Sequence, residues 1–248
     1  MRTIRRWLLL AAMEEEERAI IDRLNGLERR TWTASERGRV SGLRFKLPES
    51  RGELTVVRTG IGVVNAALAL ALVCEKERPE AVLLLGVGGA LRPELAIGEL
   101  VVARSVFQHD SFSSLDAGDF RKRSGEIVLS ESDAKKARPH CHADRNLHDW
   151  IRAEFPRSRS GTLISGNEFV GRVRRKRELS ELAPDALLVD MEGAGVALVA
   201  DRYGVPFAAA KTVADRLAPD GSIESDFSLT LRSSAAHAAE VAAKAAGL

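Results

Sequence analysis

The chain has 248 residues, of which 45% are hydrophobic and 29% are charged, a balance that is ordinary for a globular protein with a substantial core. The 37 Lys and Arg residues against 35 Asp and Glu residues give a formal net charge of +2, which does not call for a polyanionic partner. Aromatic residues make up only 5%, too few for a surface that stacks bases. We therefore expect no nucleic-acid partner.

The cysteine content and the N-terminus bear on the compartment. Cys74 and Cys141 are too few for a disulfide-rich scaffold and fit a reducing compartment. A basic start leads into the short apolar stretch Trp7–Met13, which runs into glutamates without a small-residue cleavage site. We interpret this stretch as a buried strand, and no apolar run is long enough to cross a bilayer. The prediction is a cytoplasmic protein with no membrane partner.

Short apolar runs alternate with helical patterns along the whole chain. The predicted strands are Trp7–Ala12, Leu54–Arg58, Ala81–Leu85, Glu99–Phe107, Gly161–Ser165, Ala186–Asp190 and Phe207–Val213. The predicted helices are Glu14–Leu27, Val63–Glu77, Asp144–Phe155, Arg172–Leu182, Glu192–Tyr203 and Phe227–Ala246. Several strands are apolar on both faces, which indicates helices on both sides of a sheet. We predict a single α/β domain over residues 1–248, with three αβα layers and a mixed, mostly parallel central sheet.

Three features need a separate interpretation. The irregular stretch His109–His142 is predicted to be a long loop near the functional site that could contact a partner. The basic run Arg172–Arg177 is interpreted as the solvated face of a helix, since the overall charge is balanced. The cluster His140-Cys141-His142, with His148 beyond it, lacks the second ligand pair of a zinc site, so no metal is expected.

Two glycine clusters, Gly60-Ile61-Gly62 and Gly86-Val87-Gly88-Gly89, are predicted to form turns after strands. Glycine there permits positive φ and leaves backbone N–H groups open to a ligand oxygen. A dinucleotide site would need a third glycine where Asn65 stands, and an acidic residue at the end of the strand that follows. Neither is present. The clusters therefore do not predict a nicotinamide cofactor, and no cofactor is expected.

Acidic residues follow the ends of predicted strands, where open α/β sheets bind their ligands. Glu14–Glu17 follows the first strand, Asp190 and Glu192 flank Met191 after another, and Asp215 follows the strand Phe207–Val213. Each acid has a simpler interpretation as a helix-start or capping residue, because carboxylates stabilise the positive end of a helix dipole. Their occurrence at three strand ends beside glycine clusters favours a shared site.

The motifs at these positions resemble the nucleoside phosphorylase/nucleosidase superfamily, and more narrowly the 5′-methylthioadenosine/S-adenosylhomocysteine nucleosidases. They occur in the order of that family and cover nearly the entire chain: Ala12–Glu16 (AMEEE), Thr59–Gly62 (TGIG), Gly86–Leu91 (GVGGAL), Ile97–Val101 (IGELV), Ile164–Phe169 (ISGNEF), Val189–Gly193 (VDMEG) and Val213–Asp215 (VAD). The resemblance implies a nucleoside phosphorylase-like fold, a purine nucleoside as the small-molecule partner, no cofactor and a homodimer.

The resemblance also implies catalytic roles. Glu16 would position and deprotonate the attacking water, and Asp215 would protonate or hydrogen-bond the purine at N7. Breaking an N-glycosidic bond builds positive charge on the sugar and negative charge on the departing base, so a carboxylate and a proton donor suit its two ends. We therefore expect the pKa of Asp215 to be raised in the bound complex.

Further residues would bind the substrate. Glu192 would accept hydrogen bonds from the ribose hydroxyls and Met191 would lie against the sugar. Phe169 would stack on the base, and the backbone of Val170 would reach its edge. The remaining candidates are Ile61 and Gly88 in the glycine clusters, and Phe227 beside the 5′ group in a predicted lid, Asp220–Leu229.

The choice between water and phosphate as the nucleophile depends on whether the site offers side chains that could bind a phosphate anion. A phosphorylase needs cationic groups around phosphate, whereas glutamates follow the first strand here and Val87 stands where a hydroxyl residue is common. Both features favour hydrolysis to adenine and a 5-substituted ribose, while Arg58 keeps phosphorolysis open. Ala214 replaces a frequent serine, and Lys211 stands where the family more often has an arginine. Because Val87 and Ala214 both lack the hydroxyl contacts of the family, a non-catalytic nucleoside-binding protein is a further alternative.

Overall fold

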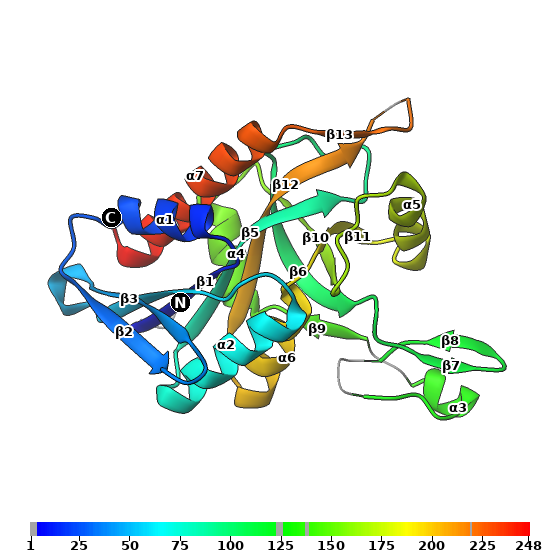
Figure 1. The fold of residues 1–248 in the computed structure, drawn as a ribbon, viewed down its shortest axis with the longest axis horizontal. Coiled ribbons are helices and arrows are strands. Elements are labelled where there is room, and N and C mark those ends of the chain that lie inside the picture. Colours follow the sequence, from blue (N-terminus) through cyan, green and yellow to red (C-terminus); the bar gives the residue numbers. More distant parts are fainter. Residues whose placement is uncertain (1–3, 123–125, 137–138, 219) are drawn as a thin grey trace.

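Strands and helices alternate along the chain in a computed structural model that describes residues 4–122, 126–136, 139–218 and 220–248 (Figure 1). The strands are β1 (Arg6–Ala11), β2 (Arg29–Ser35), β3 (Val40–Lys46), β4 (Glu53–Arg58), β5 (Ala81–Ala90), β6 (Leu100–Gln108), β7 (Ser113–Leu115), β8 (Gly118–Phe120), β9 (His140–His142), β10 (Arg159–Ser165), β11 (Ala186–Asp190), β12 (Phe207–Leu217) and β13 (Ile223–Ser225). The helices are α1 (Glu14–Arg23), α2 (Val63–Lys76), α3 (Glu131–Ala134), α4 (Arg145–Glu154), α5 (Val173–Leu182), α6 (Gly193–Tyr203) and α7 (Phe227–Ala246), with a 3₁₀ turn at Pro48–Ser50.

The large sheet is mixed, as predicted. Its strand order is β13-β12-β6-β10-β11-β5-β1-β4-β3-β2, with β9 beside β6. Parallel pairings join β4, β1, β5 and β12, and join β6, β10 and β11, whereas β2, β3, β9 and β13 add antiparallel strands. Because β5 pairs with both β11 and β12, the strands β5, β12, β6, β10 and β11 form a closed ring of pairings.

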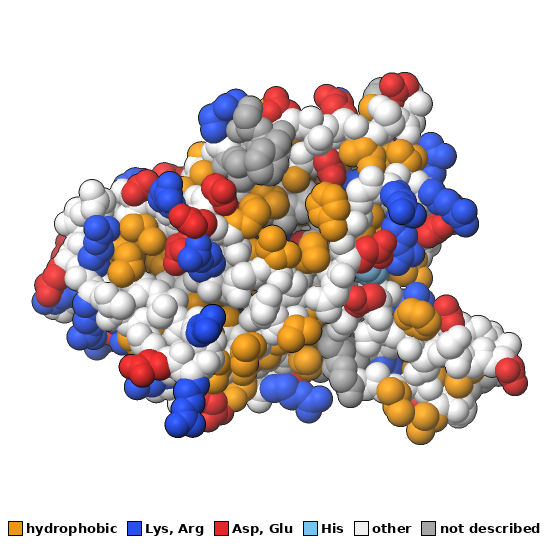
Figure 2. Space-filling model, viewed as in Figure 1, with side chains coloured by type: hydrophobic (Ala, Val, Ile, Leu, Met, Phe, Trp, Pro, Cys, Tyr) orange, Lys and Arg blue, Asp and Glu red, His pale blue; other side chains and the backbone are white. Residues whose placement is uncertain are grey.

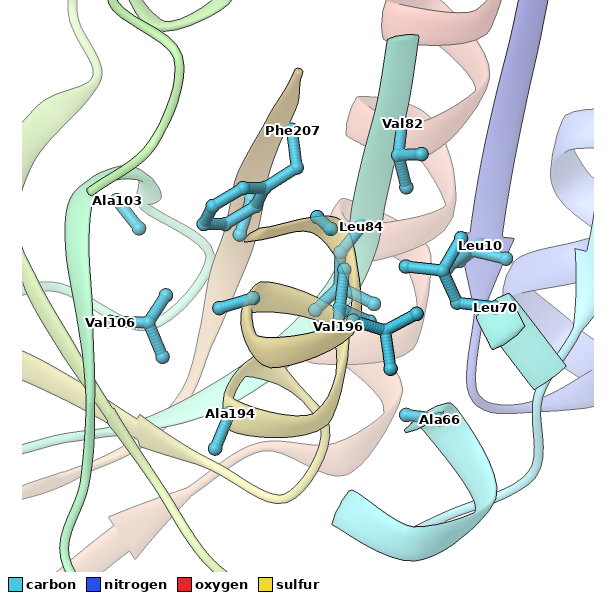
Figure 3. Packing of buried hydrophobic residues seen from close by; sticks show 14 of the residues in the cluster. Leu10, Ala66, Leu70, Val82, Leu84, Ala103, Val106, Ala194, Val196 and Phe207 are labelled. Carbon is cyan, nitrogen blue, oxygen red and sulfur yellow. The ribbon is translucent and has the colours of Figure 1, made fainter. Parts of the chain in front are cut away.

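Helices cover both faces of the sheet, which confirms the predicted layers (Figure 1). On one face, α1, α4 and α7 contribute residues such as Ile20, Ile151 and Val241 to a buried cluster with β1, β4 and β5. On the other face, α2 and α6 pack on the same strands. Figure 3 shows α6 in this cluster, with Leu10 and Leu84 of the sheet beside it. The small residues of α2 and α6 are buried here, so both helices approach the sheet closely.

The structure corrects several expected boundaries. The β2–β3 hairpin was not predicted, and α1 ends at Arg23 instead of Leu27. The strand β5 continues through the second glycine cluster to Ala90, and β12 continues to Leu217. The predicted loop 109–142 contains the β7–β8 hairpin, α3 and β9, of which β9 joins the large sheet beside β6.

Among the helices that the structure describes, none is both long enough and apolar enough to cross a membrane.

Candidate active site

A pocket opens where β1, β4, β5, β10, β11 and β12 end, the position at which α/β sheets bind ligands. Its lining includes every residue that the sequence placed in the site except Phe227: Glu16, Ile61, Gly88, Phe169, Val170, Met191, Glu192 and Asp215. Ala12, Met13, Val87, Gly89, Glu168, Val189, Asp190 and Ala214 complete it. Apolar side chains gather at the middle of the view in Figure 2, around the hollow between α2, α5 and α7.

Glu16 lies in the first turn of α1 and is only 1% exposed. Its Oε2 accepts hydrogen bonds from the backbone N–H groups of Ala12 and Met13, both at 3.1 Å, so the side chain closes the start of the helix. The buried Oε1 has no hydrogen-bond partner in the described part of the chain. Burial raises the pKa of Glu16 above its ordinary value, although Lys211 opposes the rise.

Lys211 is the buried cation beside the acidic residues, and the sequence did not place it in the site. It projects from β12, with Nζ 3.0 Å from Asp190 Oδ2 and 3.2 Å from Glu192 Oε2. Burial alone would disfavour its charge, but Asp190, Glu192 and Glu16 together raise the pKa of the ammonium above its ordinary value. Lys211 therefore stays charged and holds these carboxylates together.

Glu192 and Asp190 have backbone contacts as well. Glu192 Oε1 accepts from the N–H of Gly62 at 3.1 Å, at the start of α2, and both oxygens of Asp190 accept from the N–H of Gly193 at 3.1 Å. Gly62 has φ +107°, so the first glycine cluster forms the turn that the sequence predicts. The turn brings a backbone donor to a carboxylate of the protein.

Asp215 lines another part of the pocket wall and has its own lysine. Lys176 Nζ donates to Asp215 Oδ1 and also to the carbonyl of Ala90, the latter at 3.0 Å. Lys176 is fully buried, which corrects the interpretation of the run Arg172–Arg177 as a wholly solvated helix face. Arg174 does lie on that face and is 92% exposed.

The second glycine cluster is part of β5, not a turn as predicted, and its glycines make room for these charges. A Cβ on Gly86 would lie 2.8 Å from Glu16 Oε1 and 3.2 Å from Lys211 Nζ. A Cβ on Gly89 would lie 2.8 Å from Asp215 Oδ1 and 2.9 Å from Lys176 Nζ. Two positions on one strand thus admit two separate groups of charged side chains.

No lysine or arginine is among the pocket-lining residues that the structure describes. Arg58, the residue that kept a phosphate site open, forms ion pairs with Glu14 at 3.1 Å and Glu17 at 3.4 Å. Lys211 is held by carboxylates. The pocket therefore offers little to neutralise a phosphate dianion.

Comparison with known proteins places this site in a family. The profile of the phosphorylase superfamily matches residues 6–247. The chain belongs to the phosphorylase superfamily. A 5′-methylthioadenosine/S-adenosylhomocysteine nucleosidase from Staphylococcus haemolyticus is 27% identical over 207 residues, which cover 84% of this chain and 85% of that protein.

Solved structures in the superfamily share the fold over nearly the whole chain. The Campylobacter jejuni 5′-methylthioadenosine/S-adenosylhomocysteine nucleosidase has a TM-score of 0.77 at 25% identity, covering 99% of this chain and 100% of that one. The native futalosine hydrolase of Helicobacter pylori also has a TM-score of 0.77 at 25% identity, covering 100% of this chain and 99% of that one. The nucleoside phosphorylase-like fold predicted from the motifs is thereby confirmed.

The remaining predicted residues have different outcomes. Phe169 lies at the pocket rim and is 82% exposed, whereas Val170 is buried. The segment Asp220–Leu229, predicted to be a lid, contains β13 and the first turn of α7, and none of its described residues lines the pocket. The side chain of Phe227 lies outside the described part of the structure.

The histidine-rich cluster does not form a metal site within the described residues, where no three His, Cys, Asp or Glu side chains gather as metal ligands would. Cys141 is buried in β9, whereas His142 is exposed. His148 Nε2 lies 2.9 Å from Ser160 Oγ, and its Nδ1 lies 3.0 Å from Asp149 Oδ1.

Proposed function

We propose that this protein hydrolyses the N-glycosidic bond of a 5′-substituted adenosine and releases adenine. The observation that carries the proposal is one pocket with a buried, partly unpartnered carboxylate, Glu16, and a second acid, Asp215, on another part of its wall. The reaction needs both, because charge of opposite sign develops on the sugar and on the base. The relatives named as nucleosidases over most of this chain support the same assignment.

At the sugar, Glu16 acts as the general base. The raised pKa of Glu16 supports this role, since a base is most effective when its pKa approaches the working pH. Water attacks C1′ and gives a proton to Glu16 as the C1′–N9 bond breaks. Glu192, which is held by Lys211 and by the N–H of Gly62, accepts hydrogen bonds from the ribose hydroxyls. Met191 lies against the sugar.

At the base, the electron pair of the broken bond passes to the purine, and Asp215 gives a proton to N7. Phe169 at the rim stacks on the ring, and the backbone of Val170 reaches its edge. Ile61 and Gly88 complete the walls around the nucleoside. The products are adenine and a 5-substituted ribose.

Hydrolysis is favoured over phosphorolysis by the absence of cations from the described pocket lining. We expect adenine release from 5′-methylthioadenosine to be the same with and without phosphate, measured by chromatography of the released base in a phosphate-free buffer. Strict phosphate dependence would instead establish a phosphorylase. Tight binding without turnover would establish a non-catalytic nucleoside-binding protein.

The same assay identifies the 5′-substituent. The relatives are named for methylthioadenosine, S-adenosylhomocysteine and futalosine, so these three compounds are the first to compare by kcat/KM. A preference of tenfold or more for one compound would assign the substrate among them.

We also propose that the protein is a cytoplasmic homodimer that associates beside the pocket mouth. Ile61, Val64 and Leu68 are 54%, 68% and 48% exposed at the turn before α2 and on its first half. Figure 2 shows apolar side chains over the region where α2 lies in Figure 1. Exposed apolar groups of this kind mark protein interfaces. Phe112, in the segment predicted to contact a partner, is 50% exposed.

The dimer predicts a clear change in mass. We expect sedimentation equilibrium to give twice the chain mass for the wild type and the chain mass for Leu68→Glu, because a buried carboxylate disfavours association. The control Ala153→Glu introduces the same single charge at an exposed position of α4, which packs on the other face of the sheet from α2, and should leave the dimer intact. A wild-type protein of single-chain mass would contradict this proposal.

A further inference from the structure

Lys176 is a buried lysine with no role in the chemistry described so far. It lies in a run of basic residues on α5, yet its side chain is 0% exposed, whereas Arg174 on the same helix is 92% exposed. Burying an ammonium group is costly unless it is paired and hydrogen-bonded. The contacts of Lys176 therefore show what holds it in the interior.

Those contacts connect it to the pocket through a single side chain. Nζ donates to Oδ1 of Asp215 and, at 3.0 Å, to the carbonyl of Ala90 at the end of β5. Asp215 lines the pocket, but Lys176 is not among its lining residues. Gly89 leaves the space in which the ammonium and the carboxylate meet, since a Cβ there would lie within 2.9 Å of both. Lys176 thus lies behind Asp215 and does not face a bound nucleoside.

Other charged groups near Asp215 have partners of their own. Arg216 and Glu224, on β12 and β13, form an ion pair at 2.9 Å. Glu168 at the pocket rim pairs with Arg175 at 2.9 Å, and Lys211 is held in the cluster with Asp190, Glu192 and Glu16. Of the described charged residues, Lys176 is the one in ion-pair contact with Asp215.

We propose that Lys176 is a positioning residue for Asp215, which fixes one carboxylate oxygen and stabilises the negative charge that Asp215 acquires when it protonates the departing purine. This inference rests on the role of Asp215 in the proposed function. It also explains how the acid is oriented although Ala214 precedes it where the resemblance leads us to expect a serine.

The proton balance follows from the proposed reaction. When the C1′–N9 bond breaks, its electron pair moves to the purine and N7 takes the proton of the Asp215 carboxyl group. Asp215 is left as a carboxylate beside the Lys176 ammonium, which keeps all three of its protons. The attraction between them grows as the proton leaves, so it is stronger in the transition state than in the ground state and accelerates the step.

The test compares Lys176→Met, Asp215→Asn and the double variant, with Arg174→Met as a control that removes an exposed cation from the same helix. We expect Lys176→Met to lower kcat for adenine release by about 10- to 100-fold with little change in KM. Arg174→Met should change neither quantity.

The double variant separates positioning from general support of the fold. If Lys176 acts through Asp215, removing it in the Asp215→Asn background causes no further loss of kcat. Additive losses of kcat in the double variant would overturn the inference while leaving the proposed function intact. A wild-type rate in Asp215→Asn would instead overturn the role of Asp215 itself.

Folding of the variants is checked by urea denaturation, because removing one partner of a buried ion pair can destabilise a protein. If Lys176→Met does not fold, Lys176→Arg is the second variant, and it should retain a kcat close to that of the wild type because it keeps a cation beside Asp215. The double variant lacks both charges of the Lys176–Asp215 pair. Comparing its kcat with that of Asp215→Asn therefore also tests whether Lys176 acts through Asp215. A further loss of kcat in that comparison would overturn the inference.

Discussion

Glu16→Gln should lower kcat for adenine release by about 10²–10⁴-fold while the dissociation constant for the nucleoside changes little. The amide oxygen of glutamine can still accept the N–H groups of Ala12 and Met13, so the start of α1 is retained. The variant loses only the ability to take a proton from water. Single-turnover kinetics and equilibrium binding, measured on the same preparation, separate these two effects.

The matched control is Glu15→Gln, which removes an exposed carboxylate from the same helical turn. It should retain wild-type kcat. If Glu15→Gln and Glu16→Gln lower kcat equally, the net charge of the helical turn controls the rate and Glu16 is not the general base. If Glu16→Gln keeps the wild-type rate, the assignment of Glu16 is wrong.

Because the pKa of Glu16 is raised, the stability of Glu16→Gln should also depend on pH differently from that of the wild type. An acid with a higher pKa in the folded state holds its proton more tightly there, so ionising it costs stability as pH rises above the unfolded value of 4.5. Glutamine resembles the protonated form. We expect Glu16→Gln to match the wild-type free energy of unfolding below pH 4.5 and to exceed it increasingly above that pH, until the folded-state pKa is passed.

Lys211→Met should lower the free energy of unfolding by about 3–5 kcal/mol. The substitution keeps the length of the side chain but leaves Asp190 and Glu192, both buried, without their ammonium partner. Because the pKa of Lys211 is raised, its stabilising effect is present throughout the range below the unfolded value of 10.5 and is lost only as pH rises through the folded value. Urea denaturation at neutral pH measures the loss.

Lys244→Met is the control for Lys211. Its ammonium lies 3.3 Å from Glu154 in a partly exposed ion pair near the end of α7, and such pairs contribute about 0–1 kcal/mol. We expect a change within that range. A loss at Lys211 no greater than at Lys244 would show that the buried carboxylates do not need this cation.

Most strands that carry the site could be predicted because their sequences are locally unambiguous. Runs such as Leu8–Leu10 and Leu83–Leu85 are buried on both faces, and the acids that follow strand ends stand out against them. The hairpin of β2 and β3 was missed because it lies at the sheet edge. The first three residues of β2, Arg29, Arg30 and Thr31, are exposed, so the strand has no apolar pattern there.

The errors within the site have a different cause, which is tertiary. Gly86 to Gly89 were predicted as a turn because glycine permits positive φ, whereas β5 needs glycine there to admit side chains from other elements. Lys176 and Lys211 were missed because their carboxylate partners are 39 and 19–21 residues away in sequence, and only the fold brings them together. A signal existed for Lys211, which stands in the otherwise small and apolar strand segment Phe207–Val213.

The placement of the two glycines on one strand has a consequence for the substitutions that β5 can accept. Gly86 and Gly89 are three residues apart on β5, a separation of roughly 10 Å along a strand. A methyl group at Gly86 would press on Glu16 and Lys211, and one at Gly89 would press on Asp215 and Lys176. Alanine at either position would therefore displace one group of charges and leave the other in place, so that single substitutions on β5 can perturb the two groups independently.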